Sequence, residues 1–371
     1  MRRAITIILC FLSAVLPLGA QESSFNVVLL LNSASAGQSV ALYEGLAGRP
    51  AEVARLPGSQ LALATTALLA QQDLDTPQLE GGLEAVKFNQ GIDNDVFRLR
   101  EARQNAPAIK ELLDAIQRRN FSQKVVSTVE QLFPPGARVS TTLPLYFVAF
   151  GHNNIDAYVR RVVWRERKPV FVGEGQGELT IVVNLSKAVS YGRSVDERFL
   201  GLMSVVAHEV FHAAFGAYKD GSPVWRQYYA THRSYLDQLL DIAHNEGIAY
   251  YLTLIQQSHG RLRNDWVQNV QSAFQAFNNN AVELMSRRIT PQRAYDILRL
   301  SNTSAYWESY GAITGMIVAR QIDQTLGREA LVETVERGPI DFFQKYVSLM
   351  NRDTNLPSLA QPLLRYLSAA R

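Results

Sequence analysis

The stretch SVVAHEVFHAAFG, residues 204–216, places two histidines and a glutamate inside an otherwise apolar run. His208 and His212 are four residues apart, so on a helix both imidazoles lie on one face, one turn apart. The far side of the same helix would carry a continuous apolar stripe, formed by Phe199, Met203, Val206, Val210, Ala213 and Ala217. The stretch therefore predicts a core helix whose polar side chains need a partner, because burying them alone costs free energy.

A zinc ion would satisfy this arrangement. Two imidazoles at positions i and i+4 can share one Zn²⁺, and Glu209, about 100° round the helix from His208, is placed to hold a water and act as general base. This is the H-E-x-x-H pattern of zinc peptidases. The alternative is a pair of core histidines bonded to their neighbours, which is costly without a cation. The metzincin pattern is excluded, because Phe215 and Tyr218 occupy the positions of its glycine and third histidine.

A catalytic zinc ion needs a third protein ligand, and three candidates follow downstream: Glu246, His244 and His232. Glu246 shares an otherwise apolar helix face with Leu239, Ala243 and Tyr250, so its carboxylate needs a partner. That partner is a metal or, alternatively, an arginine in the core. His244 is turned to a different side and ranks second; His232 ranks third. Gly247 would let the helix of His208 or a ligand come close.

Four short β-branched and aromatic segments precede the histidine helix and predict one small sheet, over residues 143–151, 157–164, 168–173 and 179–186. The last segment is expected to be an edge strand that pairs with an extended peptide. Asn184 is expected to be an ordinary strand residue, and the alternative is a side-chain hydrogen bond to the peptide. From Ser194 onward the chain is expected to be helical again.

The first part of the chain has a different organisation. Residues 1–20 combine a basic start, an apolar run and a small-residue end, as in a signal peptide. Residues 21–135 are expected to form a helical N-terminal region, whose clearest amphipathic helix buries Ile109, Leu112, Leu113 and Ile116. The break FPPGAR (133–138) separates this region from a zinc peptidase domain over 136–371.

Composition argues against disulfide bonds, nucleic-acid binding and membrane insertion in the mature chain. The single cysteine, Cys10, lies inside the predicted signal peptide, so no disulfide or thiol ligand is expected in the mature chain. The formal net charge is +3 and no basic stripe appears, which argues against nucleic acid as a partner. Outside the signal peptide no apolar run approaches a membrane span, so no stable membrane insertion is expected after its removal. We expect an exported protein, periplasmic or extracellular.

HEVFH (208–212) followed by NEGIA (245–249) resembles the gluzincin zinc metallopeptidases and is similar to uncharacterised zinc-dependent peptidases of that clan. The resemblance covers residues 143–346. It implies a thermolysin-like, mainly helical α+β fold with a small mixed sheet. One departure is the segment 213–245, which is longer than in the familiar members.

The resemblance also implies a site and an activity. His208, His212 and Glu246 would hold one Zn²⁺, and Glu209 would activate the attacking water for hydrolysis of a peptide or protein substrate. Tyr306 or Tyr310 would supply the donor to the developing oxyanion, and the resemblance favours Tyr310. The alternative is a zinc-bearing binding or assembly factor of the same fold with little or no hydrolytic activity.

Overall fold

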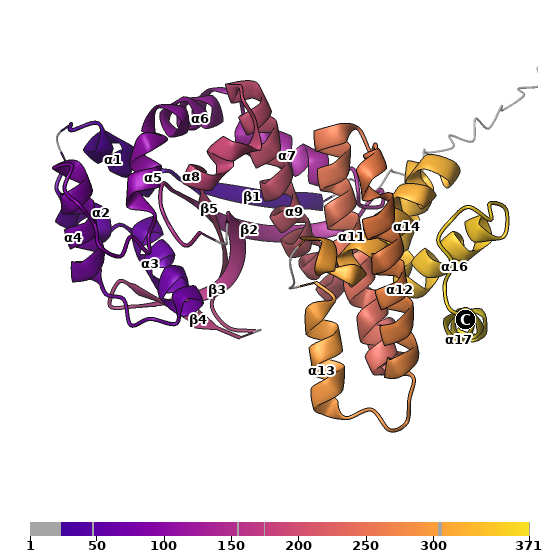
Figure 1. The fold of residues 1–371 in the computed structure, drawn as a ribbon. Coiled ribbons are helices and arrows are strands. Elements are labelled where there is room, and N and C mark those ends of the chain that lie inside the picture. The colour runs from indigo at the N-terminus through magenta and orange to yellow at the C-terminus, as the bar shows by residue number, and fades with distance from the viewer. Residues whose placement is uncertain (1–23, 47, 154–155, 174, 303–305, 371) are drawn as a thin grey trace, which may run out of the picture.

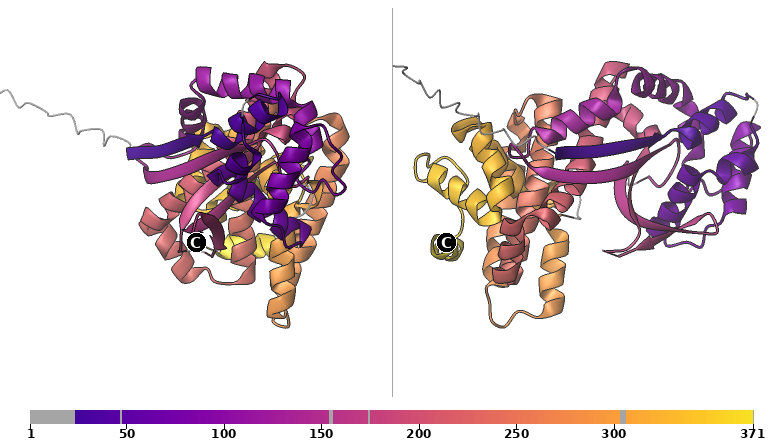
Figure 2. Two further views of the ribbon diagram at one scale, coloured as in Figure 1. Left: turned by 90° about the vertical axis from the view of Figure 1, so that its left-hand side faces the viewer. Right: turned by 180° about the vertical axis from the view of Figure 1, so that it is seen from behind.

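The computed structural model describes residues 24–46, 48–153, 156–173, 175–302 and 306–370. The predicted signal peptide, 1–20, lies outside these residues. The described chain is mainly helical with one five-stranded sheet (Figure 1). The N-terminal helices and the C-terminal helices lie at opposite ends of the molecule, with the sheet and α9 (Val195–Gly221) between them, as the view from behind in Figure 2 also shows. The α+β, mainly helical prediction is confirmed.

The sheet is mixed, with strand order β1-β2-β5-β3-β4. Strands β1, β2 and β5 are parallel to one another, whereas β3 is antiparallel to both β5 and β4. The bounds are β1 (Ser24–Asn32), β2 (Arg138–Val148), β3 (Ala157–Arg165), β4 (Lys168–Val172) and β5 (Glu178–Asn184). The four predicted strand segments therefore all form strands of one sheet.

Two expectations about the sheet were wrong. The N-terminal region begins with a strand, β1, which pairs along its whole length with β2 across the predicted break at 133–138. Strand β5 is not an edge strand but lies between β2 and β3. Its residues Ile181 and Val183 are fully buried, as expected of a strand with both neighbours in place and a covered face.

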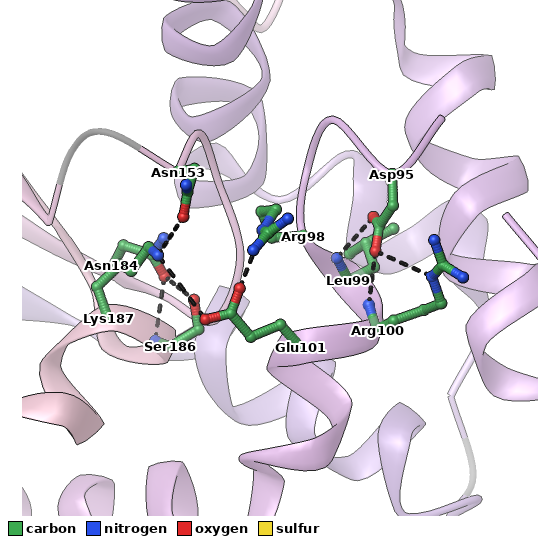
Figure 3. A network of polar contacts seen from close by, with 9 residues as sticks. All are labelled: Asp95, Arg98, Leu99, Arg100, Glu101, Asn153, Asn184, Ser186 and Lys187. Atoms are coloured by element: carbon green, nitrogen blue, oxygen red, sulfur yellow. Dashed lines mark hydrogen bonds and ion pairs between the residues drawn. The ribbon is translucent and has the colours of Figure 1, made fainter. Parts of the chain in front are cut away.

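The N-terminal helices cover one end of the sheet. Figure 3 shows how α5 (Leu99–Gln104) is tied to α8 (Leu185–Ala188) at the carboxyl end of β5. Glu101 accepts from Arg98 Nε at 2.9 Å and lies 3.7 Å from Lys187 Nζ, while Lys187 also donates to Asn153. The remaining helices of this region are α1 (Ala34–Tyr43), α2 (Pro50–Ala54), α3 (Pro57–Ala70), α4 (Thr76–Lys87), α6 (Ala106–Arg118) and α7 (Phe121–Glu130). The four apolar residues predicted to form one face of α6 are all buried.

Helix α9 is the central helix of the fold. It begins at a capping box, in which Ser194 Oγ accepts from the Glu197 amide and the Glu197 carboxylate accepts from the Ser194 amide, both at 3.2 Å. Its apolar face packs on α7 and the sheet through edge-on aromatic contacts, including Phe121 with Phe199, 5.7 Å between ring centroids. Helix α9 is long and apolar enough to cross a membrane, but two-thirds of its most apolar window (67%) is buried inside the fold. We therefore describe it as a core helix.

The C-terminal helices pack around α11 (Tyr235–Ser258), which crosses α14 (Tyr310–Leu326) in the closest helix contact of the fold. A Cβ on Gly247 would lie 2.3 Å from the Gly315 carbonyl carbon, so both glycines are required where the two backbones meet. Gly247 therefore allows α14 to approach α11. The expectation that it would admit the helix of His208 or a ligand was wrong. The other helices are α10 (Pro223–Thr231), α12 (Val267–Leu284), α13 (Pro291–Leu300), α15 (Arg328–Arg337), α16 (Pro339–Met350) and α17 (Gln361–Ala369); the 3₁₀ turns are η1 (Val189–Tyr191), η2 (Asn264–Trp266) and η3 (Tyr306–Glu308).

Candidate metal centre

Helices α9 and α11 bring three ligand groups to one point. His208 and His212 Nε2 lie 3.0 Å apart on successive turns of α9. Glu246 Oε2, from α11, lies 3.9 Å from His208 Nε2 and 3.3 Å from His212 Nε2. All three side chains are 17–21% exposed, so they open to solvent on one side while most of each side chain is covered. Three donors from two rigid helices converge as one cluster.

The separations of the three donors fit a zinc ion. Tetrahedral zinc with bonds of about 2.0–2.1 Å places neighbouring ligand atoms about 3.3 Å apart. The observed distances of 3.0, 3.3 and 3.9 Å bracket that value. Two imidazoles and one carboxylate are also the ligand set of catalytic zinc sites that keep an open fourth position. His208, His212 and Glu246 therefore fit one Zn²⁺.

Two of the three ligands are held by a further hydrogen bond, and the backbone of Ala249 lies beside the third, His208. His212 Nδ1 lies 3.1 Å from Asn245 Oδ1, which can only accept, so Nδ1 carries the proton and Nε2 presents its lone pair. Asn302 Nδ2 donates to the second carboxylate oxygen of Glu246 at 3.2 Å. Such outer contacts fix the orientation of metal ligands.

The electrostatics of the cluster favour a cation. Burial, together with the neighbouring charge of His212, lowers the pKa of His208 to about 4. Burial would also lower the pKa of His212, but the Glu246 carboxylate outweighs it and raises that pKa to about 9. Glu246 itself has a pKa of about 2, because the adjacent imidazoles outweigh the cost of burying its charge. The carboxylate thus stabilises positive charge between the three side chains.

Glu209 lies next to the cluster without joining it. Burial raises its pKa to about 7, with Glu246 and Asp156 adding to the rise and His212 and Arg160 opposing it. A carboxylate with a pKa near neutrality is suited to accept a proton and to return it. A carboxyl group with a pKa near neutrality therefore lies next in sequence to a residue of the three-ligand cluster.

Two residues that no sequence motif indicates, Tyr191 and Asp156, lie near Glu209. The Tyr191 hydroxyl donates to Asp156 Oδ2 at 2.6 Å, and the pKa of Tyr191 is raised by burial and by Asp156, with a further contribution from Glu209. Gly201 allows this approach, because a Cβ there would lie 2.6 Å from Tyr191 Cβ. No local pattern links these residues, since they come from the β2–β3 connection, η1 and α9.

A cleft of about 1160 Å³ opens beside the cluster. Its floor is the exposed side of α9 from His212 to Asp220, and its wall is formed by β2, β3, β4 and the start of β5. From α10, Tyr229 lines the cleft, whereas Trp225 and Tyr228 are buried. Ser222 caps the N-terminus of α10. The long connection between the two metal helices thus mostly packs against the domain and gives one aromatic side chain to the cleft.

The other predicted ligands lie elsewhere. His244 is fully buried, stacks on Trp225 with ring centroids 6.0 Å apart, and places Nε2 3.2 Å from Thr334 Oγ1. His232 caps the end of α10 and stacks on Tyr228, 4.5 Å between ring centroids. Neither imidazole joins the cluster, whereas Glu246 contacts both metal histidines.

Tyr310 is not in the position expected of an oxyanion donor. It is 6% exposed at the start of α14, and its hydroxyl donates to the Ile297 carbonyl oxygen at 2.6 Å. The charged groups that influence it are Arg293 and Glu283, on α13 and α12. Its hydroxyl therefore ties α14 to α13. The side chain of Tyr306, the other candidate, lies outside the described part of the structure.

Asn184 has a structural role at the end of β5. It is 4% exposed, and its Oδ1 accepts from the Ser186 amide at 3.1 Å and from Ser186 Oγ at 2.7 Å (Figure 3). These bonds cap α8 where β5 ends.

Comparison with known proteins gives one match. The model of a family described as "Putative zinc dependent peptidase (DUF5700)" matches residues 53–355, which include every residue of the cluster and most of the cleft. Neither the curated proteins nor the solved structures give a match.

Proposed function

Because the chain belongs to the family described as "Putative zinc dependent peptidase (DUF5700)", we propose that it is an exported zinc peptidase of the gluzincin type, with a thermolysin-like core. The observation that supports this best is the convergence of His208, His212 and Glu246, whose ligand atoms all lie within 4.8 Å of one another. Glu209 and an open cleft lie beside them. The order of sheet, first metal helix and second metal helix is the order implied by the gluzincin resemblance.

The chemistry divides between the metal and the chain. Zinc, when bound, polarises a carbonyl oxygen and lowers the pKa of a coordinated water. The carboxylate of Glu209 takes the proton of the attacking water and passes it to the nitrogen of the leaving amine. Asn245 and Asn302 hold His212 and Glu246 in their orientations. The three ligands and the base are thus held in position before the substrate binds. This preorganisation of charged groups is usually the largest contribution to the rate enhancement.

An open edge of the sheet offers a place for the substrate backbone. Strand β4 pairs with β3 only over Arg161–Arg165, so the stretch Ala157–Arg160 has β5 on one side and no described strand on the other. The Asp156 carbonyl accepts from Asn184 of β5, and alternation along an antiparallel strand then turns the backbone groups of Ala157 and Val159 outward. An extended peptide would pair by strand addition with the amide and carbonyl of Ala157 and the amide of Val159, whose carbonyl accepts from Arg160.

Replacing the general base tests the proposal. Glu209→Gln keeps the shape and all three ligands, so we expect it to retain bound zinc and to lose cleavage of a mixed peptide library. Glu130→Gln, an exposed residue at the end of α7, is the matched control and should retain both. Cleavage by the Glu209→Gln protein at the wild-type rate would contradict the mechanism. A wild-type protein that binds zinc but cleaves no peptide would point instead to the binding or assembly factor.

Export is the second part of the proposal. It is supported by the basic, apolar and small-residue pattern of residues 1–20. Expression with the natural N-terminus in a secreting host should give a mature protein that begins at Gln21, as measured by intact mass. A protein that keeps Met1 and stays in the cytoplasm would refute export.

A further inference from the structure

Two consecutive arginines of β3, Arg160 and Arg161, line the cleft that contains His212. Both are half-buried. Among the described residues, no carboxylate lies within 4.0 Å of either guanidinium group. Arginine is rarely buried without a carboxylate or another acceptor. Two such cations in one cleft indicate that it binds an anionic ligand.

The backbone of β3 shows where Arg160 lies. Because the Asp156 carbonyl faces β5, the Val159 carbonyl, three residues on, faces the open edge. Arg160 Nη1 donates to that Val159 carbonyl oxygen at 2.9 Å. The guanidinium group is therefore folded along the open edge of β3, where the substrate backbone would pair. One donor is used there, and the remaining donors of the guanidinium fork are available.

Arg160 lines the same cleft as His212, one of the three residues of the metal cluster. Arg161, the next residue, points to the opposite face of the strand, toward α9. The two guanidinium groups thus approach the cleft from both sides of β3.

The other charged groups of the cleft do not neutralise Arg160 and Arg161. The cation Lys219 is already bonded to Asp241 at 2.7 Å. Asp220 lies eight residues beyond His212 on α9, roughly 12 Å along the helix. Glu178 pairs with Val162 of β3, so it lies farther along the strand from the open edge than Arg161 does. Asp156, at the start of the open edge, accepts from the Tyr191 hydroxyl. Arg160 and Arg161 are therefore the cations that line the cleft beside the open edge.

We propose that Arg160 and Arg161 bind a carboxylate of the substrate, so that the enzyme selects peptides with an acidic side chain or a free C-terminal carboxylate beside the scissile bond. This inference rests on the proposed peptidase function and names its substrate class. A guanidinium fork matches a carboxylate with two parallel hydrogen bonds, and a partly water-excluded cleft strengthens them. Arg160 would then be a specificity-determining residue of the cleft.

Matched peptides test the proposal. Internally quenched peptides of one scaffold would carry Glu or Gln at each position in turn, and each would be made with a C-terminal carboxylate or amide. We expect the zinc-loaded wild-type protein to cleave the carboxylate member of at least one pair roughly 10-fold to 100-fold faster in kcat/KM. The Glu and Gln pairs and the terminal pairs separate an acidic side chain from a free C-terminus. Equal rates within every pair would overturn the proposal.

Variants assign the preference to the two arginines. Arg160→Gln and Arg161→Gln should each reduce the ratio between the carboxylate and amide peptides, whereas Arg165→Gln, at the exposed end of the same strand, should leave it unchanged. Arg160→Lys keeps the charge but not the fork, so we expect an intermediate ratio. Circular dichroism and zinc content show whether each variant is folded. Folded Arg160→Gln and Arg161→Gln proteins that both keep the full wild-type ratio would refute the inference.

A binding measurement separates this inference from the peptidase proposal. Fluorescence anisotropy with zinc-loaded Glu209→Gln protein and the same labelled peptides does not depend on cleavage. Tighter binding of carboxylate peptides, lost in the double variant Glu209→Gln/Arg160→Gln, supports the arginine site even if no peptide is cleaved. Cleavage by the wild-type protein with no carboxylate preference in binding or rate leaves the peptidase intact and removes the inference.

Discussion

Asn245 Oδ1 lies 3.1 Å from His212 Nδ1, one residue before the glutamate that completes the metal cluster. The two side chains belong to α11 and α9. The contact fixes the tautomer of His212 and links the orientation of one metal helix to the other. A single dipeptide, Asn245-Glu246, thus supplies both a ligand and the residue that orients a second ligand.

We expect Asn245→Ala to weaken zinc binding by about 10-fold to 100-fold, because the His212 ring loses the acceptor that holds it. Competition with a fluorescent chelator measures the change. Asn279→Ala, at an exposed position of α12, is the control and should bind zinc as the wild-type protein does. Equal affinities for the Asn245 variant and the control would exclude the orienting role.

Glu246→Gln should lose most of the bound zinc, because a neutral amide replaces the carboxylate that stabilises positive charge between the two imidazoles. His244→Phe and His232→Gln should keep it, since neither imidazole reaches the cluster. Elemental analysis of proteins purified without chelator compares the three. Full zinc in the Glu246 variant, with loss in either histidine variant, would move the ligand role to that histidine.

Gly247→Ala should destabilise the fold by about 1–3 kcal/mol or more, because the new methyl group would lie 2.3 Å from the backbone of Gly315 and α11 and α14 must separate. Urea unfolding measures the free energy. The control is Gly37→Ala in α1, where a Cβ meets nothing within 4 Å and alanine is expected to stabilise the helix by about 0.5–1 kcal/mol. Similar effects at both positions would show that the helix crossing is looser than described.

The ion pair of Asp323 and Arg328 predicts a pH dependence of stability. Burial would raise the pKa of Asp323, but hydrogen bonds from Arg328, at 2.7 and 2.9 Å, and from Tyr251 lower it below its ordinary value. A depressed folded-state pKa contributes stability above the unfolded-state pKa of about 3.9, and this contribution is lost as pH falls through the folded-state value.

Arg328→Met should therefore lose about 1 kcal/mol or less at pH 7, the upper limit reflecting that the arginine is 37% exposed. The difference from the wild-type protein should shrink below about pH 4. Chemical unfolding at several pH values measures it, with Arg365→Met on α17 as an exposed control. A difference that stays constant down to pH 2 would show that packing, and not charge, is responsible.

Much of the site follows from local spacing. His208 and His212 share a helix face because they are four residues apart. The capping box at Ser194 and the amphipathic sequence that follows it favour a helix there. The apolar face around Glu246 pointed to a buried carboxylate in the same way. Strands β2 to β5 also follow from their alternating or apolar residues and the turn residues between them.

Local sequence also explains the two features of the sheet that differ from expectation. The continuous apolar run of LTIVVNL (179–185) is typical of a strand buried on both faces, in agreement with the central position of β5. The run FNVVLLLN (25–32) carries β-branched residues between asparagines, which is typical of a strand such as β1. Tyr310 was assigned by resemblance, and its hydroxyl proved to be bonded to Ile297.

Local patterns are enough to predict the helix of His208 and His212 and the residue types available as ligands, because i, i+4 periodicity and capping act within a few residues. The contact of Glu246, and not His244, with the two imidazoles follows from the packing of α11 against α9. The open edge of β3 and the positions of Arg160 and Arg161 in the cleft likewise follow from the pairing of strands. These relationships depend on how helices cross and strands pair across distant parts of the chain. Such pairings are selected by packing over the whole core, and no short stretch of residues encodes them.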